Sequence, residues 1–260
     1  TPVVIECGGT DALLVDTDAD LAAAADAAVW GAMANAGQTC VGVERVYAVD
    51  GIADELTERI AAQARRLRAS AESTADFGPI TRPGQVDVIR DHLADALASG
   101  GTALVGGTES VRPPFVEPVV LTGVAETSTA VTEETFGPML TVHRVANLDE
   151  AVRRVNAGRY GLGAAVFSRR RGAQIASRLR CGMVAVNSVI SYAAVPSLPF
   201  GGVGDSGFGR IHGPDGLREF SRPKAITRRR FRPVIQVLTF NRPAWAVRLL
   251  LRIVRVLYGR

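Results

Sequence analysis

Two side chains of complementary chemistry, a cysteine and a glutamate, stand near the start of the chain. Cys40 closes the run Asn-Ala-Gly-Gln-Thr-Cys over residues 35–40, and Glu6 ends an apolar run before Cys7 and two glycines. A cysteine thiolate attacks electrophilic carbon to form a covalent intermediate, and a carboxylate can act as the general base that resolves it. The pair therefore predicts thiol-based covalent catalysis.

Structural roles compete with this interpretation. A lone cysteine is commonly a small buried apolar residue, and a lone glutamate is commonly a surface residue. His92, His143 and His212 have no spacing that singles out a partner for Cys40, so a cysteine–histidine dyad is not favoured. No group of Cys and His has the spacing of metal ligands, and no metal site is expected.

A glycine pattern late in the chain imitates a phosphate-binding loop. Gly202, Gly204 and Gly207 match the dinucleotide-binding fingerprint, but they follow Pro199 and Phe200 and not a strand. Because the fingerprint needs a strand before it and a helix behind it, the pattern predicts a tight structural loop.

Composition is that of a globular protein, with 47% hydrophobic and 22% charged residues among 260. Three cysteines do not make a disulfide framework, which favours a reducing, cytoplasmic location. The first residue is Thr1, and the apolar run at 3–5 already indicates a strand. The chain is therefore expected to be part of something longer.

Charge is distributed unevenly. Residues 222–260 hold 11 of the 30 Lys and Arg and no Asp or Glu, which leaves 19 basic against 26 acidic residues before them. The excess of basic residues thus belongs to the tail at 222–260, and residues 1–221 have no excess of basic residues that would indicate nucleic-acid binding.

Short apolar runs alternate with helical patterns up to about residue 190, which is typical of an α/β fold. The expected architecture is an open, mostly parallel twisted sheet with flanking helices. Strands are predicted at Val3–Glu6, Leu13–Val15, Arg45–Val49, Ala103–Gly106, Leu140–Arg144, Ala164–Ser168 and Met183–Asn187. Helices are predicted near Asp20–Ala34, Ile52–Arg68, Pro83–Ser99, Asp149–Ala157 and Arg170–Leu179.

The last part of the chain changes character. An irregular Gly/Ser/Pro segment covers 188–210, followed by a predicted short helix at 216–221 and a strand at 225–230. Residues 241–260 then form a basic amphipathic pattern in which arginines recur at helical spacing. A peripheral membrane contact is one interpretation, and a helix packed on its own oligomer is the other.

Four sequence blocks together resemble the aldehyde dehydrogenase superfamily, non-acylating NAD(P)-dependent type. In order, they are Glu6-Cys7-Gly8-Gly9-Thr10, Gly37-Gln38-Thr39-Cys40, Glu133-Glu134-Thr135-Phe136-Gly137-Pro138, and Pro199-Phe200-Gly201-Gly202 with Ser206-Gly207. The resemblance covers residues 1 to about 230. It implies the C-terminal half of such an enzyme, with a catalytic domain (1–221), an oligomerisation strand (222–232) and the tail (233–260). The dinucleotide-binding domain would be absent from this chain.

The resemblance also assigns roles. Cys40 matches the nucleophile that forms a thiohemiacetal and then a thioester, and Glu6 matches the base that activates water. Glu134 and Phe136 match residues beside the nicotinamide ribose and ring of NAD or NADP. Asn187 and Phe200 match positions near the substrate.

Two positions depart from the family pattern. Cys7 replaces a leucine near the expected nicotinamide, where it could be oxidation-sensitive, pair with Cys40, or be a small core residue. Thr10 replaces a lysine, and the resemblance gives this change no role. The presence of Glu6 argues against the CoA-acylating branch.

The expected reaction is oxidation of a small-molecule aldehyde to a carboxylic acid in a homodimer or homotetramer. The substrate loop at 189–198 contains no Arg or Lys, which favours an apolar aldehyde over one with a carboxylate. A semialdehyde dehydrogenase is the alternative within this class. A non-catalytic remnant and a cofactor-free thioester or ester hydrolase are the others.

Overall fold

A computed structural model of the chain describes residues 3–231 and 239–259. The chain divides into two compact units, 1–221 and 222–260, each of which is described by itself. The ends of the predicted segments 222–232 and 233–260 that fall within 232–238 lie outside the described residues.

Unit 1 is built on a seven-stranded sheet of order β10-β9-β2-β3-β8-β7-β4. Every neighbouring pair is parallel except β4 with β7, which confirms the predicted open, mostly parallel α/β fold. The strands are β2 (Asp11–Val15), β3 (Val43–Val49), β4 (Thr102–Val105), β7 (Val119–Thr122), β8 (Met139–Val145), β9 (Gly163–Phe167) and β10 (Met183–Val186).

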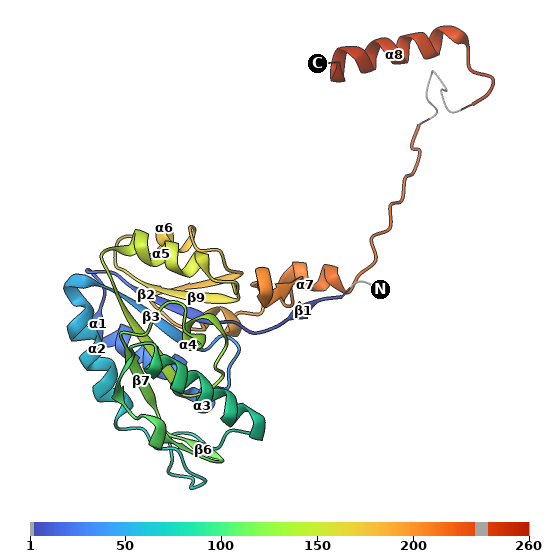
Figure 1. Cartoon of the computed structure of the whole chain (residues 1–260). Helices are drawn as coiled ribbons and strands as arrows, with labels where there is room; N and C mark the ends of the chain where they lie inside the picture. The colour runs from blue at the N-terminus through green and yellow to red at the C-terminus, as the bar shows by residue number, and fades with distance from the viewer. Residues whose placement is uncertain (1–2, 232–238, 260) are drawn as a thin grey trace. The chain divides into compact units, whose positions relative to one another are not determined.

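Helices cover both faces of this sheet (Figure 1). The helices of unit 1 are α1 (Leu21–Met33), α2 (Asp50–Ala64), α3 (Pro83–Ala98), α4 (Thr129–Thr132), α5 (Leu148–Ala157), α6 (Gly172–Ala176) and α7 (Gly213–Glu219), and of these α7 contributes no residue to the core. Strand β2 shows why both faces are needed. Leu13 packs into the core under α1 and α2, whereas Leu14 packs under α5 and α6. Successive side chains of a strand point to opposite faces, so an all-apolar strand must be covered twice.

Two small sheets and four 3-10 turns complete unit 1. Strand β1 (Ile5–Glu6) pairs with β11 (Gly207–Phe208), and β5 (Val111–Arg112) pairs with β6 (Phe115–Val116). The turns are η1 (Ala34–Gly37), η2 (Thr108–Ser110), η3 (Ser191–Ala194) and η4 (Gly204–Ser206).

One strand of the main sheet was not predicted, and one predicted strand is absent from the described residues. Strand β7 was missed because it sits in an irregular Pro-rich region, whereas β4 and β10, which are equally short, were predicted. The strand expected at 225–230 is not formed: these residues carry no strand pairing in the single chain. A strand needs a hydrogen-bonded neighbour, and an oligomerisation strand would find one only in another subunit.

Unit 2 contains one described helix, α8 (Ala244–Tyr258), in the region of the predicted amphipathic tail. Its large apolar side chains are exposed, among them Trp245 and Val256. No helix among residues 3–231 and 239–259 is both long enough and apolar enough to cross a membrane.

Candidate active site

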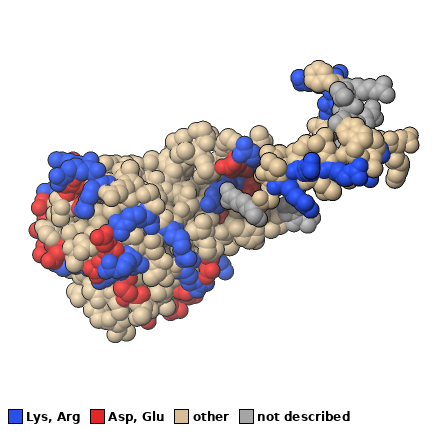
Figure 2. Space-filling view, turned by 90° about the horizontal axis from the view of Figure 1, so that it is seen from above, with Lys and Arg blue, Asp and Glu red and all other residues tan. Residues whose placement is uncertain are grey.

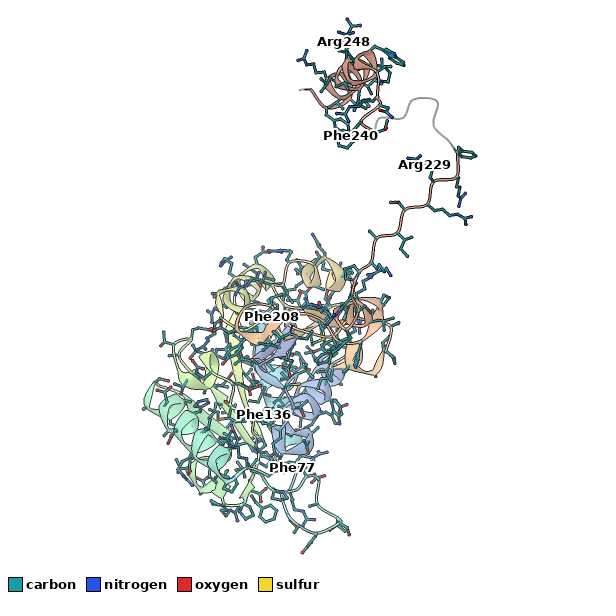
Figure 3. All side chains as sticks on the ribbon, turned by 90° about the vertical axis from the view of Figure 1, so that its right-hand side faces the viewer. Phe77, Phe136, Phe208, Arg229, Phe240 and Arg248 are labelled. Carbon is teal, nitrogen blue, oxygen red and sulfur yellow. The ribbon has the colours of Figure 1, made fainter. Side chains whose placement is uncertain are left out.

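The four sequence blocks meet at one edge of the sheet. Glu6 to Gly9 lead into β2, Cys40 leads into β3, and Glu134 with Phe136 leads into β8. Because these three strands are parallel neighbours in the order β2-β3-β8, their amino ends share one edge. The topology therefore brings the first three blocks together. Figure 3 shows Phe136 at this part of unit 1.

Close backbone approaches between blocks explain two of the glycines. Gly8 has φ 69°, and a Cβ there would lie 2.2 Å from Oε1 of Glu134. Gly37 has φ 71°, and a Cβ there would lie 2.1 Å from the carbonyl oxygen of Gly137. Only glycine permits both the left-handed backbone and the contact. The glycines thus let the Glu6, Cys40 and Glu134 segments touch.

The fourth block closes the site from the C-terminal side. Strands β1 and β11 place Glu6 opposite Gly207, and the N–H of Cys7 donates to the carbonyl of Ser206 at 3.1 Å. The Gly202–Gly207 pattern is therefore a tight structural loop packed on the Glu6 segment, as predicted. It follows Pro199 and Phe200 and opens no helix longer than a 3-10 turn.

Cys40 is half-buried and packs against a small apolar cluster. Val41, Leu162, Met183, Ala185 and Tyr192 form the cluster, and Cys40 and Phe200 both pack against it. Burial raises the pKa of the Cys40 thiol to about 11, and the nearby carboxylates of Glu6, Asp11 and Glu134 add to the rise. The resting group at neutral pH is therefore the thiol, and a nucleophilic role would require removal of its proton.

Glu6 is exposed, and it is near enough for its charge to act on the Cys40 thiol. Its Oε1 accepts a hydrogen bond from the N–H of Gly8 at 2.6 Å, which orients the group within its own turn. One oxygen is thus fixed and the second is left to meet water. This arrangement suits a general base, and it gives Glu6 a direct electrostatic influence on Cys40.

Glu134 is held against the Glu6 segment. Its Oε1 accepts from the N–H of Gly9 at 3.0 Å, while burial and the charge of Glu6 raise its pKa. Phe136 has φ 48°, an unusual backbone value for a bulky residue, which indicates that its surroundings hold it in place.

Glu44 supplies that support and was missed in the sequence. Its buried carboxylate accepts the backbone N–H groups of Thr135 and Phe136, each at 2.9 Å to Oε1. The sequence offered one signal: Glu44 and Arg45 are two adjacent charged residues inside an apolar strand pattern, and such groups are rarely buried without partners.

We expect Glu44 to make stability depend on pH. Burial raises the pKa of Glu44 from 4.5 to about 8. Between pH 4.5 and about 8, the carboxyl group is therefore protonated in the folded state and ionised in the unfolded state. Its contribution is complete below pH 4.5 and is lost as pH rises through about 8. Denaturant unfolding should show wild type losing up to a few kcal/mol more than Glu44→Gln from pH 5 to 8. Equal pH slopes for the two proteins would contradict this.

The remaining predicted residues have separate outcomes. Cys7 is exposed and is not a core residue, and none of the three cysteines, all of them described, forms a disulfide. Asn187 exchanges two side-chain hydrogen bonds with the backbone of Ser168, at 3.0 and 3.1 Å. Phe200 stands beside the Cys40 cluster and tilts against His212, with ring centroids 5.8 Å apart.

Comparison with known proteins agrees with this arrangement. A protein-family model described as aldehyde dehydrogenase family matches residues 1–226. The chain belongs to this family. A putative NADP(+) succinate-semialdehyde dehydrogenase of Mycolicibacterium smegmatis is 35% identical over 264 residues, covering 98% of this chain and 51% of the relative.

Two further matches show the range of the family. A 4,4'-diapolycopene aldehyde oxidase of Methylomonas sp is 38% identical over 224 residues, 85% of this chain and 42% of the relative. The crystal structure of an NAD-dependent aldehyde dehydrogenase from Sinorhizobium meliloti superposes with a TM-score of 0.84 at 32% identity, covering 91% of this chain and 48% of that one. The chain thus spans about half the length of the curated relatives it matches.

A hollow beside Glu134 is the place where a nicotinamide cofactor could bind to this chain. It measures about 390 Å³, and Gln38, Glu134 and Phe136 line it together with residues of α3. A carboxylate that can accept ribose hydroxyls and an aromatic ring that can flank a nicotinamide fit the cofactor's reactive end. Among the residues described, no cluster of His, Cys, Asp or Glu could hold a metal ion.

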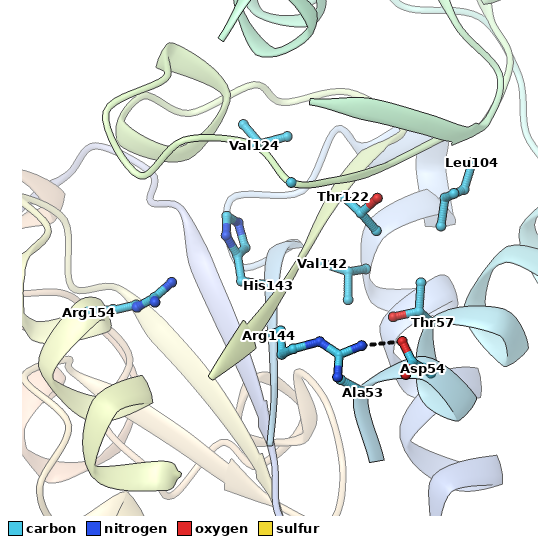
Figure 4. A pocket seen from close by; sticks show the side chains of 11 residues that line it. Ala53, Asp54, Thr57, Leu104, Thr122, Val124, Val142, His143, Arg144 and Arg154 are labelled. Carbon is cyan, nitrogen blue, oxygen red and sulfur yellow. Dashed lines mark hydrogen bonds and ion pairs between the residues drawn. The ribbon is translucent and has the colours of Figure 1, made fainter. Parts of the chain in front are cut away.

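A second, larger hollow of about 560 Å³ lies at the opposite, carboxyl edge of the sheet (Figure 4). Its lining includes Arg144, which pairs with Asp54, and His143, whose Nδ1 lies 3.2 Å from Glu126. Arg154 also lines it and binds Glu126. Its arginines are already neutralised, so the hollow offers no unpaired charge for a ligand.

Proposed function

We propose that this chain is the catalytic half of an aldehyde dehydrogenase that oxidises an aldehyde to a carboxylic acid through Cys40 and Glu6. The observation that carries the proposal is the convergence of a half-buried thiol, an exposed carboxylate and a cofactor-facing hollow at one sheet edge. Family membership supports it.

The residues suit a two-stage reaction. The Cys40 thiol gives up its proton to solvent water, and the sulfur then adds to the aldehyde carbon to form a thiohemiacetal. A nicotinamide cofactor held by Glu134 and Phe136 would supply the hydride acceptor for that carbon, so that a thioester would remain on Cys40. Glu6 then takes a proton from water, the water oxygen attacks the thioester carbon, and the acid leaves as the thiol of Cys40 is restored.

Glu134 and Phe136 would hold the nicotinamide end of the cofactor. The relatives do not decide between NAD and NADP, since one is named for NADP(+) and the structural neighbour for NAD. The direct test is aldehyde-dependent formation of reduced nicotinamide by the intact polypeptide that contains this chain. Formation with either cofactor supports the proposal, and its absence with both, across aldehydes of different size, overturns it.

Titration of the 260-residue chain with NAD(P) separates an enzyme from the alternative of a non-catalytic remnant. Tight binding by this chain alone would count against the remnant. A cofactor-free hydrolase would instead cleave esters without nicotinamide.

We favour an apolar aldehyde as substrate. The loop at 189–198 has no basic residue, and Arg210, close behind it, donates to the carbonyls of Gly202 and Gly209. No cation of this segment is therefore free to bind a substrate carboxylate. The name of the mycobacterial relative favours a semialdehyde instead. Comparing kcat/KM for a medium-chain aldehyde with that for succinate semialdehyde decides between them.

We also propose that α8 contacts anionic membrane surfaces peripherally. Arg248, Arg252 and Arg255 fall within about 60° of the helical wheel, and apolar residues fill the rest. Arg248 projects from α8 in Figure 3, and in Figure 2 the tail carries blue and no red side chains on the face in view. A basic stripe beside exposed apolar residues suits the interface of an anionic bilayer.

Replacing these three arginines with glutamate is expected to weaken binding to phosphatidylserine-containing vesicles at least about a hundredfold. The triple lysine variant keeps the charge and should bind like wild type, and neutral vesicles should bind both proteins poorly. Sedimentation with vesicles measures this. Unchanged binding of the glutamate variant would contradict the proposal and favour a helix packed within a homodimer or homotetramer.

A further inference from the structure

Asp11 is a buried carboxyl group at the amino end of β2, only 4% exposed. It stands directly after the Glu6–Thr10 block, yet neither the sequence blocks nor the proposed reaction uses it. A carboxyl group taken out of water must find hydrogen-bond partners or lose its charge. Its partners therefore indicate what the fold employs it for.

The two oxygens of Asp11 join three separate segments. Oδ1 accepts the N–H of Gly163, where β9 begins, at 2.9 Å. Oδ2 accepts the hydroxyl of Tyr192, in turn η3 of the substrate loop, at 3.4 Å. A Cβ on Gly163 would lie 2.2 Å from the Tyr192 oxygen and 2.3 Å from Oδ2 of Asp11. Only glycine at this position lets the loop reach the sheet.

The anchored loop is the one that packs beside the nucleophile. Tyr192 belongs to the apolar cluster against which Cys40 and Phe200 rest. Near the start of the loop, Val189 and the first residue of β3, Val43, both lie against Gly31 of α1. The loop is therefore held at two points, and Asp11 supplies the polar one.

We propose that Asp11 is a positioning residue whose hydrogen bond to Tyr192 holds the loop at 189–198 against Cys40 and so sets the width of the aldehyde site. This inference rests on the proposed function. Asp11 touches neither substrate nor cofactor and acts through Tyr192. The substrate class is the apolar aldehyde of the proposed function, whose side chain would meet the apolar cluster that contains Tyr192 and contacts Phe200.

Asp11 also faces charged and titratable groups from each element packed on it. Arg45 lies on β3, Glu134 before β8, Tyr192 in the loop, and Cys181 before β10. Burial raises the pKa of Asp11 to about 7, while the Gly163 N–H and Arg45 oppose the rise. Above neutral pH its charge adds to those that raise the pKa of Cys40.

The first test is kinetic, in the intact polypeptide with aldehydes of increasing size. Asp11→Asn and Tyr192→Phe should each lower kcat/KM about ten- to a hundredfold, because small displacements at a site have effects of this order. The double variant should be no worse than the poorer single variant, since both remove one interaction. Additive losses, or single variants within twofold of wild type, would overturn the proposal.

Asp16→Asn is the matched control. Asp16 is equally buried, at 1% exposure, but lies beyond the other end of β2, where it binds Arg171 and Ser168. Its loss should lower stability without changing the ranking of aldehydes. A changed ranking in this control would show that general destabilisation explains the Asp11 result and would overturn the proposal.

Two further readouts need no aldehyde turnover. Hydrogen exchange of the loop at 189–198 should accelerate at least about tenfold in both Asp11→Asn and Tyr192→Phe and stay unchanged in Asp16→Asn. The pH midpoint for alkylation of Cys40 by iodoacetamide should fall in Asp11→Asn alone. Unchanged hydrogen exchange would contradict the positioning role of Asp11 even if the protein oxidises aldehydes. Faster exchange without aldehyde oxidation would support that role and count against the proposed function.

Discussion

Replacing Cys40 with serine is expected to lower the rate of aldehyde oxidation by about 10⁴-fold or more in the intact polypeptide. The hydroxyl of serine is a far weaker nucleophile than the thiol that it replaces. Because Cys40 is only half-buried, stability should stay within about 1 kcal/mol of wild type. Steady-state formation of reduced nicotinamide and denaturant unfolding measure the two effects.

Cys181→Ser is the matched control for this prediction. Cys181 is also partly buried, and its S–H donates to the carbonyl of Met183 at 3.3 Å, a contact that serine can keep. The control should retain most of its activity. Normal turnover by Cys40→Ser, or an equal loss in both variants, would contradict the assignment of the nucleophile.

Replacing Glu6 with glutamine is expected to separate the two halves of the reaction. Removing a general base typically lowers a rate by about 10²–10⁴-fold, so kcat should fall while the first turnover still releases one reduced nicotinamide per site. Next to burial, the charge of Glu6 raises the pKa of Cys40, so that pKa should fall below about 11. Alkylation of Cys40 at pH 8 should therefore be faster in Glu6→Gln.

Glu133→Gln serves as its control because Glu133 stands in the third sequence block but binds Arg159 and Tyr160 at the surface. It should show neither a burst nor faster alkylation. Slower alkylation in Glu6→Gln would mean that Glu6 removes the thiol proton. A kcat unchanged in Glu6→Gln would exclude Glu6 as the base for deacylation.

Much of the fold could be predicted from periodicity alone. The strand around Leu13 and Leu14 and the alanine-rich helix α1 follow directly from apolar runs and from Asp20, whose side chain caps Ala22 and Ala23. The resemblance to aldehyde dehydrogenases identified the site blocks, and the two glycines after Glu6 indicated a close approach of backbone or substrate. The sequence could not say that Gly8 contacts Glu134 or that Gly37 contacts Gly137.

The features that were not predicted depend on contacts between residues that are far apart in the sequence. Strand β7 lies in a Pro-rich region for which no strand was predicted, and it pairs with β8 and β4. Glu44 and Asp11 look like ordinary charged residues, and only their burial and distant partners reveal what they hold. The residues at 225–230 show the converse, because a good strand pattern forms no strand without a neighbour to pair with.

The sulfur of Cys40 is the atom that is expected to carry the acyl group. Glu6→Gln protein, mixed with an aldehyde and NAD(P)+ and then quenched in acid, should gain the mass of one acyl group. Peptide mapping should place that group on Cys40, with Cys7 and Cys181 unmodified. An acyl group on either of those cysteines, or none after reduced nicotinamide has formed, would contradict the central claim.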